Sequence, residues 1–356
     1  MVGAKLARSP RLTGDHVRVL IAEAAGDVER ICEPEIVARV DLPPAAREFL
    51  RRPDMPALGA DLEWLRVSGA RLLLWGEADY PQPLAAIGGA PAALYVMGDV
   101  TALQAPQLAM VGARRASPAG RAIASELAGA LTRAGLTVTS GLAVGIDAAS
   151  HRGALAVGGR TVAVLGTGLD QIYPAENTEL AQRIRTEGVL VSEFPPRTRA
   201  QRQNFPRRNR VISGLALGTL VVEAAERSGS LITAQRALEQ GREVFAVPGS
   251  IRNPLSRGCH RLIKEGAQLV EGPADVLSGI RFPHIYQLVD TSVDNPPLDK
   301  EYEMLLDALG FEPATIDTLV ARSGLSGESI ASMLLILELE GRIAPYPGGL
   351  YGRLSK

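Results

Sequence analysis

From about residue 107 the chain carries short apolar runs, each as long as one buried strand, and segments of helix length separate most of them. Short apolar strands that alternate with helices are typical of a parallel sheet covered on both faces. The loops that follow such strands lie along one edge, where these sheets bind ligands. The expected strands are Leu108–Val111, Leu136–Thr139, Thr161–Leu165, Val189–Val191, Thr219–Val222 and Val244–Val247, and the expected helices are Pro118–Ala134, Val144–Val157, Thr178–Thr186 and Leu231–Gln240.

The region before this α/β core has a different pattern. Residues 1–70 predict short helices separated by polar breaks, Val28–Val40 and Pro44–Leu50 among them. Leu72–Met97 reads as a partly extended connector. The sequence therefore predicts a small helical domain over residues 1–70 and a core domain over 71–282.

The region after the core predicts a linker and a winged helix. Residues 283–300 lack periodicity and carry several prolines, as linkers do. Helix–turn–helix followed by a hairpin, expected over 301–356, is the winged-helix order. Its last helix has no basic residue before Arg342, so we expect this domain to bind protein, or to pack on the rest of the chain, rather than to grip duplex phosphates. The expected elements are helices at Glu301–Leu309, Thr315–Ser323 and Ser329–Glu340 and a hairpin within Gly341–Leu354.

Composition narrows the class of protein. No apolar run approaches the roughly 18 residues of a membrane span, and the first residues do not resemble a signal peptide, so we expect a cytoplasmic protein. Cys32 and Cys259 stand alone, and the four histidines are scattered singly. We therefore expect no disulfide, no metal and no cofactor.

The net charge of −1 is unevenly distributed. Residues 105–280 hold 21 Lys and Arg against 14 Asp and Glu, whereas residues 1–104 hold 11 against 14 and residues 281–356 hold 6 against 11. An anionic partner is therefore expected on the basic middle of the chain.

The loop after the first core strand, GARRASP at 112–118, has the residues of an anion site. Gly112 permits a tight turn, Ser117 is placed to cap the next helix, and Arg114 lies beside the free amides of that helix start. The alternative is an ordinary strand–helix turn with solvated arginines. No Gly-Lys-Ser/Thr follows, so it is not a P-loop.

The next two loops also carry glycines. SGLAVGID at 140–147 presents Ser140 and Gly141 to an anion, and Gly168 in the third loop allows close backbone approach. Asp147 is expected as a structural cap with His151 as its partner, because no nucleophile is placed for a catalytic pair. Tyr173 either stacks on a base or covers the sheet edge.

The segment RTRAQRQNFPRRNR at 197–210 holds six arginines, one aromatic residue and no acid. We expect it in a strand-end loop, where guanidinium groups bind phosphates and Phe205 stacks on a base. That combination suits a single strand, since a duplex hides its bases. Glu223 is expected to fix the loops through an ion pair rather than act as a general base.

Taken together, these motifs resemble the DNA-processing protein A (DprA/Smf) family. The shared runs are YPQPL near 80, GARRAS at 112, SGLAVGIDAASH at 140, GTGLDQIYPAEN at 166, SEFPP at 192, FPRRNRVISGLA at 205, VEAAERSGSLITA at 222 and NPLSRGCHRLIKEGA at 253. The resemblance implies an extended Rossmann-like sheet core, with a SAM-like helical domain before it and a winged helix after it. It also implies a homodimer that binds single-stranded DNA without sequence preference, protects incoming DNA in natural transformation, loads the RecA recombinase and catalyses no reaction.

By position, the family's phosphate-binding arginine is Arg114, its base-stacking aromatic is Phe205 and its basic residue three positions earlier is Arg202. The same motif contains Arg207, Asn209 and Arg210, which are expected to contact DNA or to be structural. The loop residues Gly112, Ser140, Gly141 and Gly168 complete the expected DNA-binding set.

A nucleotide-processing enzyme related to phosphoribohydrolases is the alternative. The signature of those enzymes is Pro-Gly-Gly-x-Gly-Thr-x-x-Glu, and residues 213–224 keep Gly218 and Thr219 but lack its start. Glu223 also falls one residue late and at a strand end.

Overall fold

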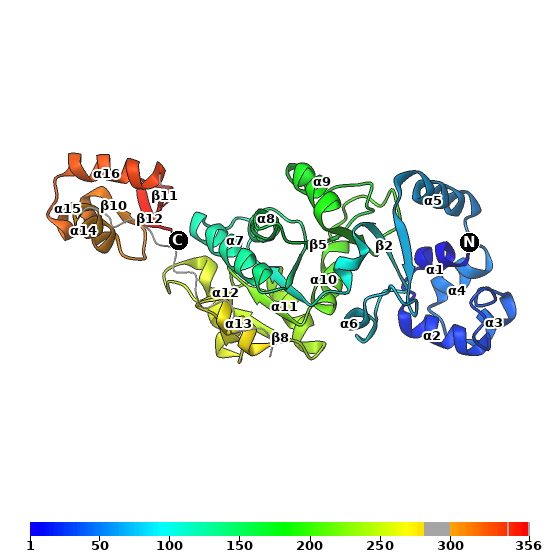
Figure 1. The fold of residues 1–356 in the computed structure, drawn as a ribbon. Coiled ribbons are helices and arrows are strands. Elements are labelled where there is room, and N and C mark those ends of the chain that lie inside the picture. The colour runs from blue at the N-terminus through cyan, green and yellow to red at the C-terminus, as the bar shows by residue number, and fades with distance from the viewer. Residues whose placement is uncertain (281–299, 340–341, 355–356) are drawn as a thin grey trace.

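The computed structural model describes residues 1–280, 300–339 and 342–354, which form a helical N-terminal region, a central α/β unit and a small C-terminal unit (Figure 1). Apart from residue 300, the predicted linker at 283–300 lies outside the described residues.

The central unit is built on a nine-stranded sheet whose order is β1-β2-β6-β5-β4-β3-β7-β8-β9. The strands from β6 to β9 in that order are parallel, whereas β1 and β2 pair antiparallel at one edge. Every strand predicted after residue 107 is therefore confirmed, and the segment read as a connector supplies two more. The bounds are β1 Arg71–Leu74, β2 Ala93–Gly98, β3 Gln107–Val111, β4 Thr137–Ser140, β5 Thr161–Leu165, β6 Val189–Ser192, β7 Gly218–Val221, β8 Glu243–Ala246 and β9 Gln268–Leu269.

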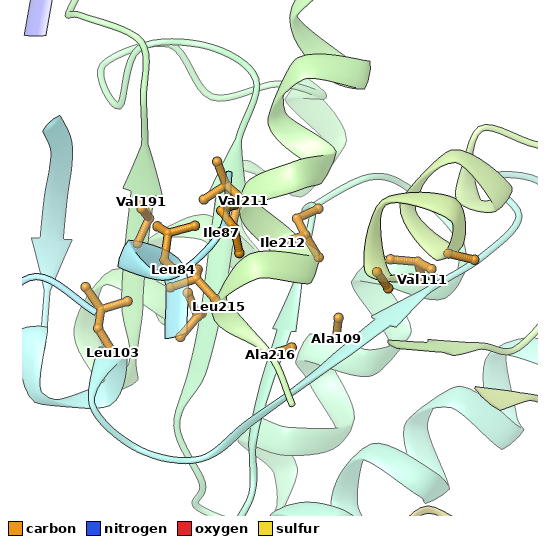
Figure 2. Packing of buried hydrophobic residues seen from close by; sticks show 14 of the residues in the cluster. Leu84, Ile87, Leu103, Ala109, Val111, Val191, Val211, Ile212, Leu215 and Ala216 are labelled. Atoms are coloured by element: carbon orange, nitrogen blue, oxygen red, sulfur yellow. The ribbon is translucent and has the colours of Figure 1, made fainter. Parts of the chain in front are cut away.

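Helices cover both faces of this sheet, as the double burial of its strands requires. Alternate side chains of β3 enter two different cores: Ala109 and Val111 pack with Val211 and Ile212 of α10 (Figure 2), while Leu108 and Met110 face the other cluster. The helices are α6 Gln82–Ala85, α7 Pro118–Arg133, α8 Ile146–Ala156, α9 Thr178–Glu187, α10 Asn204–Leu215, α11 Ser230–Glu239, α12 Arg257–Lys264 and α13 Pro273–Gly279, with short 3₁₀ turns at Val100–Leu103, Ala175–Asn177 and Pro254–Ser256.

The order of the sheet reverses at β3. The chain runs from β3 outward through β4, β5 and β6 on one side, and then returns to β7 on the other side of β3. The loops after β3 and β7 therefore part from each other and leave a crevice at the carboxyl edge. That crevice is the place to look for a ligand.

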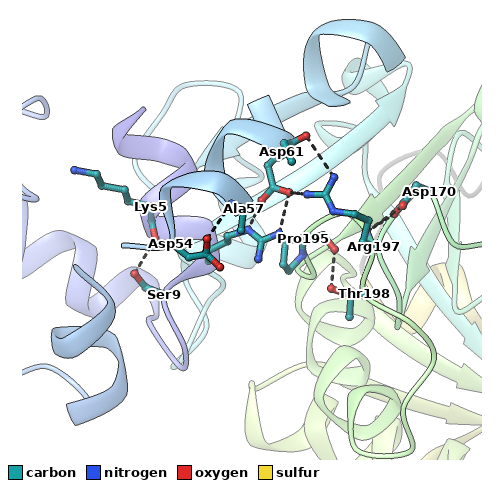
Figure 3. Close-up of polar contacts among 11 residues, drawn as sticks. Lys5, Ser9, Asp54, Ala57, Asp61, Asp170, Pro195, Arg197 and Thr198 are labelled. Atoms are coloured by element: carbon teal, nitrogen blue, oxygen red, sulfur yellow. Dashed lines mark hydrogen bonds and ion pairs between the residues drawn. The ribbon is translucent and has the colours of Figure 1, made fainter. Parts of the chain in front are cut away.

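The N-terminal region consists of five helices: the first four surround their own apolar cluster, and Trp64 and Leu65 of the fifth pack against the central unit. The predicted helix Val28–Val40 forms only from Pro34, because the residue before a proline is disfavoured in the helical conformation and proline suits the first helical turn. The buried carboxylate of Asp61 joins this region to the core, since it accepts hydrogen bonds from Arg8 and from Arg197 (Figure 3). The helices are α1 Val2–Arg8, α2 Gly14–Glu23, α3 Pro34–Arg39, α4 Pro44–Arg51 and α5 Met55–Ser68.

The C-terminal unit has the predicted winged-helix fold, in which three helices precede a hairpin that pairs with β10. Among the described residues, Ser250 of the core donates to Glu312 of this unit at 2.9 Å, and the amide of Ala119 donates to the hydroxyl of Tyr346 at 3.4 Å. Its elements are α14 Lys300–Leu309, β10 Ala314–Thr315, α15 Ile316–Ser323, α16 Gly327–Leu339, β11 Ile343–Tyr346 and β12 Leu350–Arg353.

In the described ranges no single helix is long and apolar enough to cross a membrane. Helices α15 and α16 would qualify only as a pair bent by 111°, by length and composition alone. Both contribute side chains to the apolar core of the winged helix.

Candidate nucleic-acid interface

The crevice at the carboxyl edge is a cleft of about 660 Å³. We call it the switch-point cleft, because the loops after β3 and β7 form two of its walls and α10 forms a third. Five of the predicted residues line it: Gly112, Arg114, Arg202, Phe205 and Asn209. The β7–α11 loop adds Arg227 and Ser228, and the start of α11 adds Ser230.

Phe205 lies at the centre of a row of three side chains. The guanidinium carbon of Arg114 lies 5.4 Å from the Phe205 ring centroid, and the ring of Tyr173 lies 5.5 Å from it on a tilted plane. The Phe205 ring approaches Gly166 so closely that a Cβ there would lie 2.9 Å from its Cδ1 atom. A cation and two exposed or half-buried rings thus lie in contact with one another at the cleft.

The helix start after β3 is already occupied by a carboxylate. Glu223 accepts hydrogen bonds from the amide and the hydroxyl of Ser117, at 2.9 and 2.6 Å, and the Ser117 hydroxyl caps α7 through the Gly120 amide. The predicted ion pair of Glu223 is therefore wrong, and so is the expectation of free amides at this helix start. A carboxylate stabilises a helix N-terminus as an anion would. Of the groups predicted to bind an anion here, the Arg114 guanidinium is the one that lines the cleft.

Arg208 is the residue that sequence reasoning missed. It is buried, and its Nη1 atom donates to the carbonyl of Gly141 at 2.6 Å and to that of Val164. The pKa of Arg208 is lowered to about 10, mainly by burial, which Asp147 opposes and to which Arg114 adds a smaller effect. Arg208 thus pins α10 to the ends of β4 and β5. The sequence holds one signal for this role: Arg208 comes three residues after Phe205, so in a helix the two side chains lie on the same face.

The loop after β4 uses its polar groups internally. The buried hydroxyl of Ser140 donates to the carbonyl of Met110 at 2.6 Å, and the amide of Gly141 donates to Asp147. A Cβ at position 141 would lie 2.6 Å from the Arg208 guanidinium, so glycine is required there. Ser140 and Gly141 therefore shape the cleft wall from inside, and the Ser140 hydroxyl is not available to an anion.

Gly168 is also engaged within the protein. Its amide donates to the carbonyl of Thr198 at 2.9 Å, and a Cβ there would lie 2.7 Å from the carbonyl oxygen of Pro195. Gly168 thus allows the loop before α10 to lie against the loop after β5.

Asp147 and His151 do not form the expected pair. Asp147 is buried and accepts from the amides of Gly141 and Ala143, and burial raises its pKa. The Nδ1 atom of His151 instead lies 2.7 Å from the Thr161 hydroxyl. Over the ranges that the structure describes, no group of three or more His, Cys, Asp or Glu could hold a metal.

The burial of His151 predicts an acid-dependent loss of stability. Burial, reinforced by Arg208 and Arg152, lowers the pKa of His151 to about 3, below its usual 6.5. Between those pH values the unfolded chain binds a proton that the folded chain does not, so the free energy of unfolding falls as pH falls, by up to about 1.4 kcal/mol per pH unit. Denaturant titrations from pH 7 to 4.5 should show a steeper fall for the wild type than for His151→Gln. An equal fall in the free energy of unfolding for the two proteins would contradict this prediction. The titration of Asp147 affects both proteins alike, so it cancels in the comparison.

The basic segment 197–210 is not one loop. Its second half forms the first two turns of α10. With 3.6 residues per turn, Phe205, Arg208 and Asn209 point to one side, whereas Arg207 and Arg210 point to the other. Both of the latter are ion-paired to Glu193, at 2.9 and 2.5 Å, and neither lines the switch-point cleft. The prediction that the whole segment lies in a strand-end loop is therefore wrong.

Residues 71–281, more than half of the chain, match the family described as DNA recombination-mediator protein A, and residues 290–349 match the DprA winged helix domain. The chain belongs to this family. It is 43% identical over 318 residues to Protein Smf of Escherichia coli, covering 87% of this chain and 84% of that protein. It is 46% identical over 203 residues to the DNA processing protein DprA of Streptococcus pneumoniae, covering 57% and 72%.

Solved DprA structures share the fold. The X-ray structure of DprA from Streptococcus pneumoniae superposes with a TM-score of 0.68 at 37% identity, covering 77% of this chain and 95% of that one. DNA processing protein A from Helicobacter pylori, described with a single-stranded DNA binding mode, gives 0.54 at 27% identity, covering 59% and 94%. The resemblance to the DprA family read from the motifs is thereby confirmed.

Proposed function

We propose that this DprA-family protein binds single-stranded DNA in the switch-point cleft. Arg114 and Arg202 neutralise phosphates, and Phe205 stacks on a base, with Asn209 beside it. The observation that carries the proposal is the Arg114 guanidinium held 5.4 Å from the Phe205 ring at the carboxyl edge of the sheet. One cation and one aromatic face supply the two sequence-independent contacts that a single strand offers.

The family relationship supports a wider role. We propose a recombination mediator that protects incoming DNA and loads RecA, acts as a homodimer in the cytoplasm and catalyses no reaction. The single-stranded DNA binding mode described for the Helicobacter pylori relative supports the ligand. The family description as a recombination-mediator protein supports the process.

Salt dependence tests the proposal. If about three to five arginines meet phosphates, log affinity for single strands should fall with log salt at a slope of about −2 to −3.5. Arg114→Ala should reduce that slope by about 0.7, the value for one phosphate contact on a single strand. Phe205→Ala should weaken binding by about 1–3 kcal/mol and leave the slope nearly intact, because it removes stacking only.

Arg115→Ala is the matched control, because Arg115 is the exposed neighbour of Arg114 and does not line the cleft. Binding of single- and double-stranded oligonucleotides is measured by fluorescence anisotropy at several salt concentrations. Equal slopes for the wild type and Arg114→Ala would contradict the assignment of Arg114.

A further inference from the structure

Helix α10 has a second basic groove on the side opposite to the switch-point cleft. This groove, of about 430 Å³, is bounded by Arg207 and Arg210 of α10, by Gln203 just before the helix, by Gly89 of the core and by Arg11 of the N-terminal region. We call it the rear groove. It joins the helical N-terminal region to the core, so the core alone does not complete it.

The rear groove carries excess positive charge. Arg207 and Arg210 share a single oxygen of Glu193, a buried carboxylate, and Arg207 remains 42% exposed. Arg11 adds a third guanidinium that is exposed and, within the described part of the chain, has no hydrogen-bonding or ionic partner. The other nearby carboxylate is that of Asp15, which accepts from the Gly89 amide and lies 3.9 Å from Arg18. The described residues that line the groove thus include three arginines and no acidic residue.

The backbone at Arg11 is unusual for an arginine. Its φ of 59° lies in the left-handed region, which favours glycine and asparagine. The next residues are held against the core, where the Gly14 amide donates to the Ala90 carbonyl at 2.8 Å and Thr13 bridges to Pro91. Arg11 is therefore held at the groove in a backbone conformation that arginine rarely adopts.

The two basic surfaces meet at the start of α10. Arg202 and Phe205 line the switch-point cleft, while Gln203 and Asn204, between them in sequence, line the rear groove. A helix with its side chains is about 10–12 Å across. A few nucleotides of a single strand are long enough to cross it.

We propose that the rear groove is a second anchoring site for the same DNA strand, which leaves the switch-point cleft over the start of α10 and lays its sugar–phosphate backbone on Arg11, Arg207 and Arg210. This inference rests on the proposed function. Its ligand is a polyanion of regular charge, read without regard to sequence. Because residues 202–205 contribute to both surfaces, a strand that crosses the start of α10 passes from one to the other.

Strand length separates the two sites. Full-length wild type, Arg11→Gly and Arg207→Ala are titrated with oligodeoxythymidylates of about 6 and about 20 nucleotides, which bracket the usual length of single-strand sites. Arg11→Gly removes the charge and also suits the left-handed backbone, so its fold is preserved. Arg52→Ala, an exposed arginine of the same region outside both grooves, is the control.

Each groove variant should bind the long oligonucleotide about tenfold more weakly at about 50 mM salt, with a slope reduced by about 0.7, as expected for one lost phosphate contact. Binding of the short oligonucleotide should be unchanged. The proposal would be overturned if the groove variants bound the long oligonucleotide as tightly as the wild type, or if they lost equal affinity for both lengths. It would also be overturned if Arg11→Gly weakened binding of polyglutamate but not of DNA. If instead Arg114→Ala and Phe205→Ala did not weaken binding of single strands, the proposed function itself would be refuted.

Discussion

Arg208→Ala is expected to lower the free energy of unfolding by about 3–5 kcal/mol. The substitution leaves the carbonyls of Gly141 and Val164 without their donor in a buried place, removes a cation from beside the buried Asp147 and opens a cavity. Each buried polar group left without a partner costs about 1–3 kcal/mol, and truncating one partner of a buried charge network costs about 3–5 kcal/mol. Single-strand binding should weaken as well, because Phe205 lies one turn away on the same helix.

Urea denaturation followed by circular dichroism measures the change for Arg208→Ala. Arg152→Ala is the control, since Arg152 is an exposed arginine of the same unit, and it should change stability by less than about 0.5 kcal/mol. A fully stable Arg208→Ala protein would show that α10 is held by its apolar face alone.

Asp61→Ala is expected to cost about 2–4 kcal/mol and to loosen the N-terminal helices from the core. Asp61 is fully buried, and it receives a two-pronged contact from Arg8 and a further hydrogen bond from Arg197 (Figure 3). Hydrogen bonds to charged groups contribute about 1.5–3 kcal/mol each. The Arg197 contact lies at the lower end, because that side chain is 47% exposed and screened by water.

Denaturant titration measures the loss of stability of Asp61→Ala, and limited proteolysis reports whether residues 1–70 are released first. Glu63→Ala is the matched control: it removes an exposed carboxylate from the same helix, where Glu63 pairs with Arg66, and should leave the stability nearly unchanged. Equal stabilities of the two variants would show that the Asp61 junction does not hold the region in place.

Most of the central sheet could be predicted, because a strand buried on both faces must be apolar along its length. Runs such as Leu108–Val111 and Thr161–Leu165 have that property, and each coincides with an observed strand to within one residue. The antiparallel strands β1 and β2 were not expected as part of the sheet. β1 is only partly buried, so its pattern is weak, and its place depends on pairing with β2 across residues 75–92, which contain α6.

Helix α10 could not be predicted from composition. A run of six arginines between polar amides reads as a solvated loop, and it begins as one. Its second half becomes helical because Val211, Ile212 and Leu215 are buried against the sheet, and that apolar face lies beyond the basic run. The tertiary contact decided the local structure.

The role of Glu223 was hidden for a related reason. A carboxylate near many arginines suggests an ion pair, yet its partner is Ser117, 106 residues away in sequence. The two meet because β3 and β7 are neighbours, which places the end of one strand beside the helix start after the other. This contact depends on the order of the strands in the sheet, which cannot be predicted from a short stretch of sequence.

The anchoring of α10 has a consequence for the thermodynamics of complex formation. A helix held at its centre by a buried guanidinium and along its length by apolar packing presents Phe205 on a scaffold assembled before the ligand arrives. The protein then gives up little conformational freedom on association, and the ordering entropy falls on the polynucleotide. The flexible single strand is then the component that changes its conformation on binding.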